Sequence, residues 1–413
     1  MIYAQQSFGL DPAFGKQGMV VCDKTLLGDL VANSVYSMAV RADGSIVVAT
    51  SDEHRQGGLL IALDKNGQPD GPSGHARYIH LEFEGHEFEE GVGVQELADG
   101  RLLFTAWLEG EGEALWVPGF AMVNADLSLD TSFGDQGFTV VPFDELRQAR
   151  VASAAQAGAR PAAQVGAVMG TAAHFVIPFV VNDEQTFVIR LLANGKLDTG
   201  YHGRGYQEIV YEGRECELPA ATTLEDGRML LAGRLTAGSQ TLIVALTAQG
   251  EIDASFGKEG VALVDLPEAR LLSIFQSPEH RLQVSGFLGN QGLLASLMPD
   301  GALDTQFNQG APLYLRPDAA RLRVERLETG LDGLICGVGQ DHALNLVESK
   351  GVLTCHGLDG APHPAFGPQG TLFVDKSFGF WDLKLQRGDK WLVAGSHSPS
   401  RAGLVCRYMH ASR

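Results

Sequence analysis

The sequence lacks the basic segments and long apolar runs that mark several common classes of protein. Its 31 lysines and arginines are outnumbered by 50 aspartates and glutamates, so the formal net charge is −19, and no basic run offsets it. A field of that sign repels the phosphates of nucleic acids and acidic membrane surfaces. Nothing approaches the roughly 18 uninterrupted apolar residues of a membrane-spanning helix. We therefore expect no nucleic-acid partner and no membrane association.

The first residues and the cysteines indicate the compartment. Residues 1–12 have neither a basic start nor an apolar core, so they do not have the pattern of a secretory signal. The five cysteines are an odd number and include no CxxC pair, which suits free thiols in a reducing compartment. These features predict a cytoplasmic location, with export by another route left open.

Familiar catalytic and cofactor-binding motifs are also missing. There is no G-x-S-x-G elbow, no HExxH, no calcium loop and no Rossmann glycine pattern after a strand. Two segments, 9–17 and 250–259, approach a phosphate-binding loop. A Walker loop needs four residues between its glycines and a hydroxyl after its lysine, whereas these have five or six, and no hydroxyl follows Lys16 or Lys258. We expect no cofactor and no metal ion.

What the chain does contain is apolar residues, glycine and a repeated motif. Hydrophobic content of 45% with 20% charged residues describes a globular protein with a large core. Glycine, with 51 residues, exceeds the usual share of roughly 7% and indicates many tight turns. The motif reads LDPAFGKQG at 10–18, LDTSFGDQG at 129–137, IDASFGKEG at 252–260 and LDTQFNQG at 303–310, with looser copies at 197–205 and 360–370.

The residue types of the motif favour a structural role. An aspartate accepts hydrogen bonds from backbone amides two residues on, which fixes a turn. Glycines take dihedral angles that are closed to other residues. The aromatic residue is suited to filling the gap between neighbouring repeats. We interpret the motif as a device of the fold, because a ligand site would need more distinctive exposed groups than one carboxylate and one aromatic ring.

The aromatic residues of the motif mark its period. They are Phe14, Phe133, Tyr201, Phe256, Phe307 and Phe366, and the gaps between them are 119, 68, 55, 51 and 59 residues. The first gap is about twice the others, which indicates a decayed copy near 66–81. Seven units then divide the 413 residues into about 59 each, a period that predicts a solenoid, propeller or array.

Each unit consists of short apolar runs between turn residues. In 242–297 the runs are four to eight residues long and rich in valine, leucine and isoleucine, which indicates strands. Asp-Gly dipeptides at 42–45, 98–101, 225–228 and 331–334 suit tight hairpins. Four antiparallel strands repeated seven times predict an all-β fold, a seven-bladed β-propeller.

The repeat also resembles a known family. LDxxFGxxG followed some 25 to 30 residues later by DGRMLLAG is similar to the delta-60 repeat of bacterial propeller-like proteins. The resemblance covers essentially the whole chain. It implies the repeat fold and is nearly silent on function, because the family is defined by its repeat and has no shared catalytic residues to carry over. The chain departs from the pattern in the decayed second copy, in Asn308 where glycine is expected, and in the insertion GLDGAPHP.

We therefore expect a single propeller domain over 1–413. Its approximate blades are 24–83, 84–143, 163–211, 212–266, 267–316, 317–375, and 376–413 together with 10–23.

The two ends of the chain predict how the ring closes. With the strands of a blade lettered A to D from the centre outwards, the chain opens on a D strand at 19–23 and ends on A, B and C strands. The N-terminal strand should therefore pair with 403–409 and complete the last blade, which leaves no free edge. Residues 144–162 break the pattern. Their alanine-rich composition predicts an inserted helical connection, with the helix over 145–158.

Function is expected on the rim opposite the motif turns, where the loops vary. Trp381 offers a ring that can stack on a sugar or peptide. Histidines near carboxylates also invite a metal hypothesis, although no ligand pair has a readable spacing. The residues predicted to form the ligand face are His54, Arg55, His86, Glu87, Arg214, His342, Trp381 and His397.

This face predicts a binding or interaction module for a protein, peptide or glycan. The alternative is a propeller enzyme, a lyase or hydrolase, with histidine and acidic residues at the channel mouth. An enzyme should show histidine and carboxylate side chains that converge with perturbed pKa values, whereas a binder should show a broad face. The oligomeric state stays open at this point.

Overall fold

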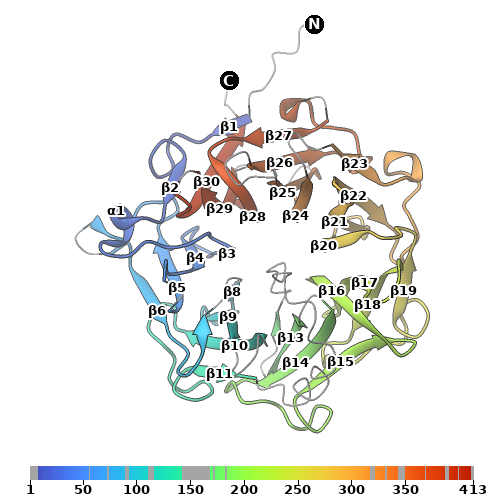
Figure 1. Ribbon diagram of the computed structural model, residues 1–413, viewed down its shortest axis with the longest axis horizontal. Helices are drawn as coiled ribbons and strands as arrows, with labels where there is room; N and C mark the ends of the chain where they lie inside the picture. The colour runs from blue at the N-terminus through green and yellow to red at the C-terminus, as the bar shows by residue number, and fades with distance from the viewer. Residues whose placement is uncertain are drawn as a thin grey trace, which may run out of the picture.

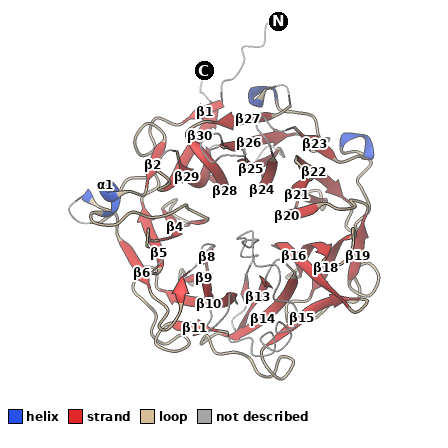
Figure 2. Ribbon diagram, in the orientation of Figure 1, coloured by secondary structure: helices blue, strands red, loops and turns tan. Residues whose placement is uncertain are grey.

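The computed structural model describes residues 8–54, 56–71, 74–88, 93–109, 116–141, 168–170, 173–181, 184–316, 321–330, 333–342, 349–367, 369–386, 390–398 and 400–410. Within these ranges strands dominate, and the helices are short: one α-helix, α1 (Lys24–Leu27), and 3-10 turns that include Asn308–Gly310 and Pro364–Phe366 (Figure 2). The all-β prediction is confirmed. No helix in this part of the chain is long and apolar enough to cross a membrane. The predicted connection at 144–162 lies outside the described residues.

Three sheets contain four strands each, hydrogen-bonded in chain order. The first is β3 (Ser37–Val40), β4 (Ile46–Ser51), β5 (Gly58–Leu63) and β6 (Tyr78–Leu81). The second is β20 (Arg270–Gln276), β21 (Leu282–Leu288), β22 (Gln291–Leu297) and β23 (Leu313–Leu315). The third is β24 (Leu322–Thr329), β25 (Ile335–Asp341), β26 (Lys350–His356) and β27 (Thr371–Val374).

Three further sheets are larger. In one, β7 (Glu87–Phe88) and β8 (Gly93–Glu96) both pair with β9 (Leu102–Glu109), which is followed by β10 (Trp116–Val123) and β11 (Phe138–Val140). The last sheet holds β28 (Ser377–Gln386), β29 (Lys390–His397) and β30 (Gly403–His410) with β1 (Phe8–Leu10) and β2 (Met19–Val21). The eight-stranded sheet is β12 (Met169–Gly170), β13 (His174–Val181), β14 (Gln185–Leu192), β15 (Tyr206–Tyr211), β16 (Arg214–Thr223), β17 (Met229–Leu235), β18 (Thr241–Leu246) and β19 (Val261–Val264).

The eight-stranded sheet departs from the expected pattern of separate four-stranded units. Its halves are joined by two residue pairs, Val210 with Glu215 and Tyr211 with Arg214. The join forms because Glu212 and Gly213 both adopt positive φ angles, 50° and 74°, and reverse the chain within two residues. β16 therefore starts directly beside β15. The count of seven blades stays a prediction.

The sheets are arranged around a common centre, with β3, β8, β16, β20, β24 and β28 on the inner side (Figure 1). Neighbouring inner strands are in contact and are tied by side chains that accept backbone N–H groups. Ser273 Oγ accepts from Leu327 N (3.1 Å), and Asp382 Oδ2 accepts from Met38 N (2.8 Å). Each sheet lies between two others, which explains why strands such as β4 and β5 are buried along their whole length.

The N-terminal strand pairs with the last strand of the chain, as predicted. In β2 and β30, Met19 faces Cys406 and Val21 faces Leu404. β1 pairs with the far end of β30, a contact that the sequence did not indicate. The two ends of the chain therefore share one sheet (Figure 1).

The aspartates of the repeated motif fix their own turns. Asp11 accepts a hydrogen bond from Ala13 N at 3.0 Å, and Asp130, Asp198, Asp253 and Asp304 make the same contact two residues on. Each of these aspartates also contacts an arginine, at distances from 2.7 to 3.5 Å. In the same order the arginines are Arg407, Arg101, Arg190, Arg228 and Arg281.

The aromatic residues of the motif pack against the next repeat. All six are at most 7% exposed. A Cβ on Gly67 or Gly195, in the turns of the following units, would lie 2.7 Å from the ring of Phe14 or Phe133, respectively. The next residue of the motif donates to the same turns, as in Gly15 N to Asn66 O at 2.7 Å. These contacts support the interpretation of the motif as a device of the fold.

Candidate functional site

Four inner strands carry a β-bulge opposite a glycine of the neighbouring strand. The pairing shifts between Glu217 and Ala220, Leu271 and Ser273, Val324 and Arg326, and Phe380 and Asp382. A Cβ on the facing glycine would collide with a backbone carbonyl oxygen of the bulged strand, so glycine is required there. Those glycines are Gly233, Gly286, Gly339 and Gly395. Bulges of this kind turn a side chain in a new direction.

The bulged residues differ from one repeat to the next. In β16 and β20 they include Pro219 and Leu272, which are buried. In β24 and β28, which are in contact, they are Glu325 and Trp381. Glu325 is 4% exposed, and Trp381 is half-buried. The same backbone device therefore places a carboxyl group and an indole on neighbouring strands.

Hydrogen bonds and packing join these two side chains into one cluster. Glu325 Oε1 accepts from Gln340 Nε2 of β25 at 2.9 Å. A Cβ on Gly379 of β28 would lie 3.1 Å from Gln340 Cβ and 3.4 Å from Trp381 Cζ2. The Trp381 ring lies 5.4 Å from the Tyr36 ring, centroid to centroid, at an angle of 51°. We call Glu325, Gln340, Gly379, Trp381 and Tyr36 the bulge cluster.

A cation stands beside the carboxyl group of the cluster. Burial raises the pKa of Glu325 above its usual range, against the hydrogen bond from Gln340 and the charge of Arg323. The Arg323 guanidinium lies 4.6 Å from the centroid of the Phe287 ring. Its Nε is buried and has no hydrogen-bond partner among the residues described. Glu325 is thus held toward its neutral, proton-donating form.

His342 follows β25 and lies in the same charged surroundings. Its backbone N donates to Arg321 O at 2.6 Å. Burial and the charges of Arg323 and Arg321 lower the pKa of His342, and Asp341 opposes them. Its Nδ1 is buried without a hydrogen-bond partner in the described ranges. The lowered pKa therefore favours the neutral imidazole, one nitrogen of which can accept a proton, and the ring follows the strand that pairs with the one carrying Glu325.

Two of the predicted site residues belong to this region. Trp381 lies in the bulge cluster. The charge of Arg323 acts to lower the pKa of both His342 and Glu325. Glu325, Gln340 and Arg323 were missed by the sequence analysis. The available signal was the glycine that recurs at Gly233, Gly286, Gly339 and Gly395, which marks the bulges.

The other predicted residues make local contacts. Arg214 binds Glu212 and Gln240 at 3.2 and 3.1 Å, and His397 Nδ1 contacts Ser400 Oγ at 2.8 Å. His86 Nδ1 faces Glu109 O at 3.3 Å, beside the exposed Glu87 of β7. Arg55 lies outside the described residues. A single ligand face formed by all eight residues stays a prediction.

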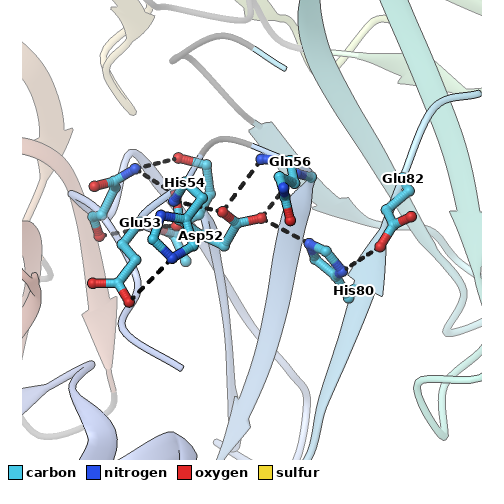
Figure 3. Close-up of polar contacts among 10 residues, drawn as sticks. Asp52, Glu53, His54, Gln56, His80 and Glu82 are labelled. Atoms are coloured by element: carbon cyan, nitrogen blue, oxygen red, sulfur yellow. Dashed lines mark hydrogen bonds and ion pairs between the residues drawn. The ribbon is translucent and has the colours of Figure 1, made fainter. Parts of the chain in front are cut away.

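A second polar cluster organises the loop after β4 (Figure 3). Asp52, 3% exposed, accepts from the backbone N of His54 (2.7 Å), Gln56 (3.2 Å) and Gly57 (2.9 Å). The same carboxylate faces His80 Nε2 at 2.8 Å. Although burial raises it, the pKa of Asp52 is lowered overall by the contacts with His80 and the loop amides.

The histidine of this second cluster lies between two carboxylates. His80 Nδ1 contacts Glu82 Oε1 at 2.9 Å, on the side away from Asp52 (Figure 3). The predicted residue His54 instead lies near Glu53 at 3.7 Å, with its side chain 72% exposed. Four contacts occupy both Asp52 oxygens, so we assign this cluster to holding the loop. In the described part of the chain no group of three or more His, Cys, Asp or Glu is placed to hold a metal ion.

Comparisons with known proteins bear on the fold. No family model and no curated protein matches the sequence. A catalytically inactive virginiamycin B lyase from Staphylococcus aureus, solved with quinupristin, is 9% identical, with a TM-score of 0.51 over 95% of this chain and 98% of that chain. An α-L-arabinanase from Penicillium chrysogenum, solved with arabinobiose, is 8% identical, with a TM-score of 0.46 over 95% and 98%. The likeness to the lyase supports a β-propeller-like, all-β fold.

Proposed function

We propose that this chain is an enzyme that uses general acid–base catalysis, a lyase or a hydrolase, with Glu325 as proton donor and His342 as proton acceptor. This is the alternative that the sequence analysis left open, in place of a binding module. The observation that carries it is the pairing of β24 and β25, which brings a buried carboxyl group and a neutral imidazole to one arginine. Environments that push two pKa values apart divide the acid and base roles.

Each of these side chains has a defined task in the proposed reaction. Glu325 donates its proton to the oxygen of the leaving group. His342 takes a proton either from a water molecule, in hydrolysis, or from a carbon next to the broken bond, in elimination. Arg323 stabilises negative charge that develops on the substrate, and its low-dielectric position strengthens that effect.

The architecture of the proposed enzyme is a seven-bladed propeller in which the eight-stranded sheet counts as two blades, β12–β15 and β16–β19. Support comes from the bulge and facing glycine of β16 and β17, which repeat those of β20 and β21. The fold alone does not imply an activity, so the proposal rests on the residues. A cytoplasmic location is part of it, supported by five buried free cysteines.

Turnover assays on the purified chain test the proposal. The hydrolase arm measures reducing ends released from arabinan, xylan and soluble cellulose fragments. The lyase arm follows the ultraviolet absorbance of unsaturated products from uronate polysaccharides. We expect wild type to turn over at least one substrate, and Glu325→Gln and His342→Asn to lose about 10²- to 10⁴-fold in kcat, the usual contribution of general acid–base catalysis.

A histidine–glutamate pair in the turns before β15 and β19 provides the control. His202 Nε2 and Glu251 Oε2, 3.1 Å apart and exposed, are replaced as His202→Asn and Glu251→Gln, which should keep the wild-type rate. Wild-type protein without turnover in either arm contradicts the proposal. So do Glu325→Gln and His342→Asn variants that keep the full rate.

A binding module is the second candidate, favoured by the half-exposed aromatic pair of Trp381 and Tyr36. Its ligand would be a protein, a peptide or a glycan. Tight binding of an oligosaccharide without any chemical change, unaltered by Glu325→Gln, would support this candidate over the enzyme.

A further inference from the structure

We propose that Trp381 and Tyr36, with Gln340, form a subsite for a neutral sugar ring beside Glu325. The inference rests on the proposed function and names a glycan as the substrate of that site. The observation behind it is the juxtaposition of the Trp381 indole on β28, the Gln340 carboxamide on β25 and the buried Glu325 carboxyl group on β24, with Tyr36, just before β3, beside the indole.

The position of Trp381 is not explained by the core. Its neighbours Phe380 and Leu383 are fully buried, and Asp382 accepts the backbone N–H of Met38. The bulge between Phe380 and Asp382 turns Trp381 away from these buried side chains and leaves it half-buried. At the same bulge in β20, the residue is Leu272, which is 3% exposed and fills space.

The chemistry around the indole suits a sugar. The C–H face of a pyranose or furanose ring packs on an aromatic face, and its hydroxyl groups need donors and acceptors at the edge. Gln340 gives one N–H to Glu325, and a carboxamide has a second N–H and a carbonyl oxygen with which to bind a hydroxyl group. The two aromatic rings and the carboxamide carry no charge, so they suit the neutral hydroxyl groups and the C–H face of a sugar ring.

Gly379 allows the carboxamide and the indole to lie side by side. A Cβ there would be 3.1 Å from Gln340 Cβ, 3.3 Å from Gln340 Oε1 and 3.4 Å from Trp381 Cζ2. Those distances are tighter than ordinary contacts for the first two atoms, so a methyl group would displace the amide. Gly379 therefore keeps open the junction between the hydrogen-bonding side and the aromatic side of the subsite.

Binding of neutral tetrasaccharides to the full chain tests the subsite directly. Arabinotetraose, xylotetraose and cellotetraose are titrated by calorimetry, and the indole N–H resonances of the four tryptophans report which ring is affected. We expect one of these sugars to bind wild type and to shift the Trp381 resonance, identified by its absence in Trp381→Phe. Trp381→Ala should weaken binding at least tenfold, and Tyr36→Ala several-fold.

Two control variants, one conservative and one away from the subsite, distinguish a loss of sugar binding from a loss of folding. Trp381→Phe keeps an aromatic ring and should bind within a few-fold of wild type. Tyr314→Ala removes an aromatic residue of β23 that is 39% exposed, and should bind as wild type does. Gly379→Ala keeps both aromatic rings but displaces the Gln340 amide, so it should also weaken sugar binding.

The outcomes distinguish the subsite from the proposed function. Glu325→Gln that binds the sugar but does not turn it over supports both. Trp381→Ala that binds as tightly as wild type, while Glu325→Gln abolishes turnover, overturns the subsite and leaves the enzyme. If none of the three sugars shifts the Trp381 resonance, the subsite is wrong whatever the turnover assays show.

Discussion

The motif turns and the bulge cluster are built by the same repeats but use them in opposite ways. At the motif turns, each of five aspartates makes the same backbone contact and meets an arginine, and the aromatic residues are buried. At the bulges, the backbone is repeated while the side chain changes from Leu272 to Glu325 to Trp381. At the motif turns, the same side chains recur in each repeat and hold the repeats together. At the bulges, the side chains differ between repeats, and two of them form the candidate site.

Buried polar atoms without a hydrogen-bond partner among the described residues occur in both regions. Arg323 Nε and His342 Nδ1 lack hydrogen-bond partners within the described residues, although both are buried. Orphaned polar groups of this kind cost free energy unless a ligand or water completes them. At the motif turn, the Asp11 carboxylate is 3% exposed and meets Ala13, Arg407 and Lys390, while Arg407 Nη2 makes an ion pair with Asp11 and no hydrogen bond.

The largest expected effect on stability comes from breaking a motif contact. Arg407, 2% exposed, binds Asp11 through two nitrogens at 2.8 and 2.9 Å and Lys65 O at 2.6 Å. Arg407→Ala leaves the buried Asp11 carboxylate with a weaker set of partners. We expect the free energy of unfolding in urea to fall by about 3–5 kcal/mol.

An equivalent motif pair in an exposed setting is the control for Arg407. Arg228 contacts Asp253 at 3.3 Å, but its side chain is 36% exposed. Arg228→Ala should therefore cost less than about 1 kcal/mol. Equal losses for the two variants would show that burial does not set the strength of the motif contact.

Two histidines with lowered pKa values, His356 and His342, should differ in how they affect the pH dependence of stability and turnover. His356 of β26 is 1% exposed, its Nε2 contacts Thr354 Oγ1 at 2.7 Å, and burial lowers its pKa to about 4. The unfolded chain takes up the proton near pH 6.5, roughly the ordinary value. The native state therefore binds fewer protons than the unfolded state between these values, and the stability present above about pH 6.5 is lost as pH falls toward 4.

The size of the acid effect follows from the shift. A difference of roughly 2.5 pKa units corresponds to about 3 kcal/mol. His356→Gln should remove this part of the acid destabilisation, seen as a flatter dependence of unfolding free energy on pH in urea titrations, with turnover unchanged. His342→Gln, in the half-buried site, should change turnover more than acid stability. If the two variants behave alike, the division between structural and functional histidines is wrong.

The strands and the pairing of the chain ends could be predicted from the sequence, because each leaves a local or periodic pattern. The contact between Glu325 and Gln340 could not. It depends on a register shift between Val324 and Arg326, and the alternation of residues in β24 gives no sign of it. The arginine partner of Asp11 was missed for a related reason, since 396 residues separate Asp11 from Arg407.

Glycine substitutions at two bulges separate the shared backbone from the site that it supports. A Cβ on Gly286 or on Gly339 would collide with a carbonyl oxygen of the facing strand. Neither glycine has a positive φ angle, so the cost comes from that collision alone. Gly286→Ala and Gly339→Ala should each lower the free energy of unfolding by about 1–3 kcal/mol, as expected for overpacking.

Their effects on function should differ, because the two bulges present different side chains. Displacing the bulge opposite Gly286 moves Leu272, which is buried between sheets. Displacing the bulge opposite Gly339 moves Glu325 away from Gln340, whose amide holds the carboxyl group at 2.9 Å. Urea unfolding and turnover are measured on both variants. Similar destabilisation with a loss of kcat confined to Gly339→Ala supports a common scaffold with one site, and equal losses of kcat would mean that turnover follows the integrity of the ring rather than the position of Glu325.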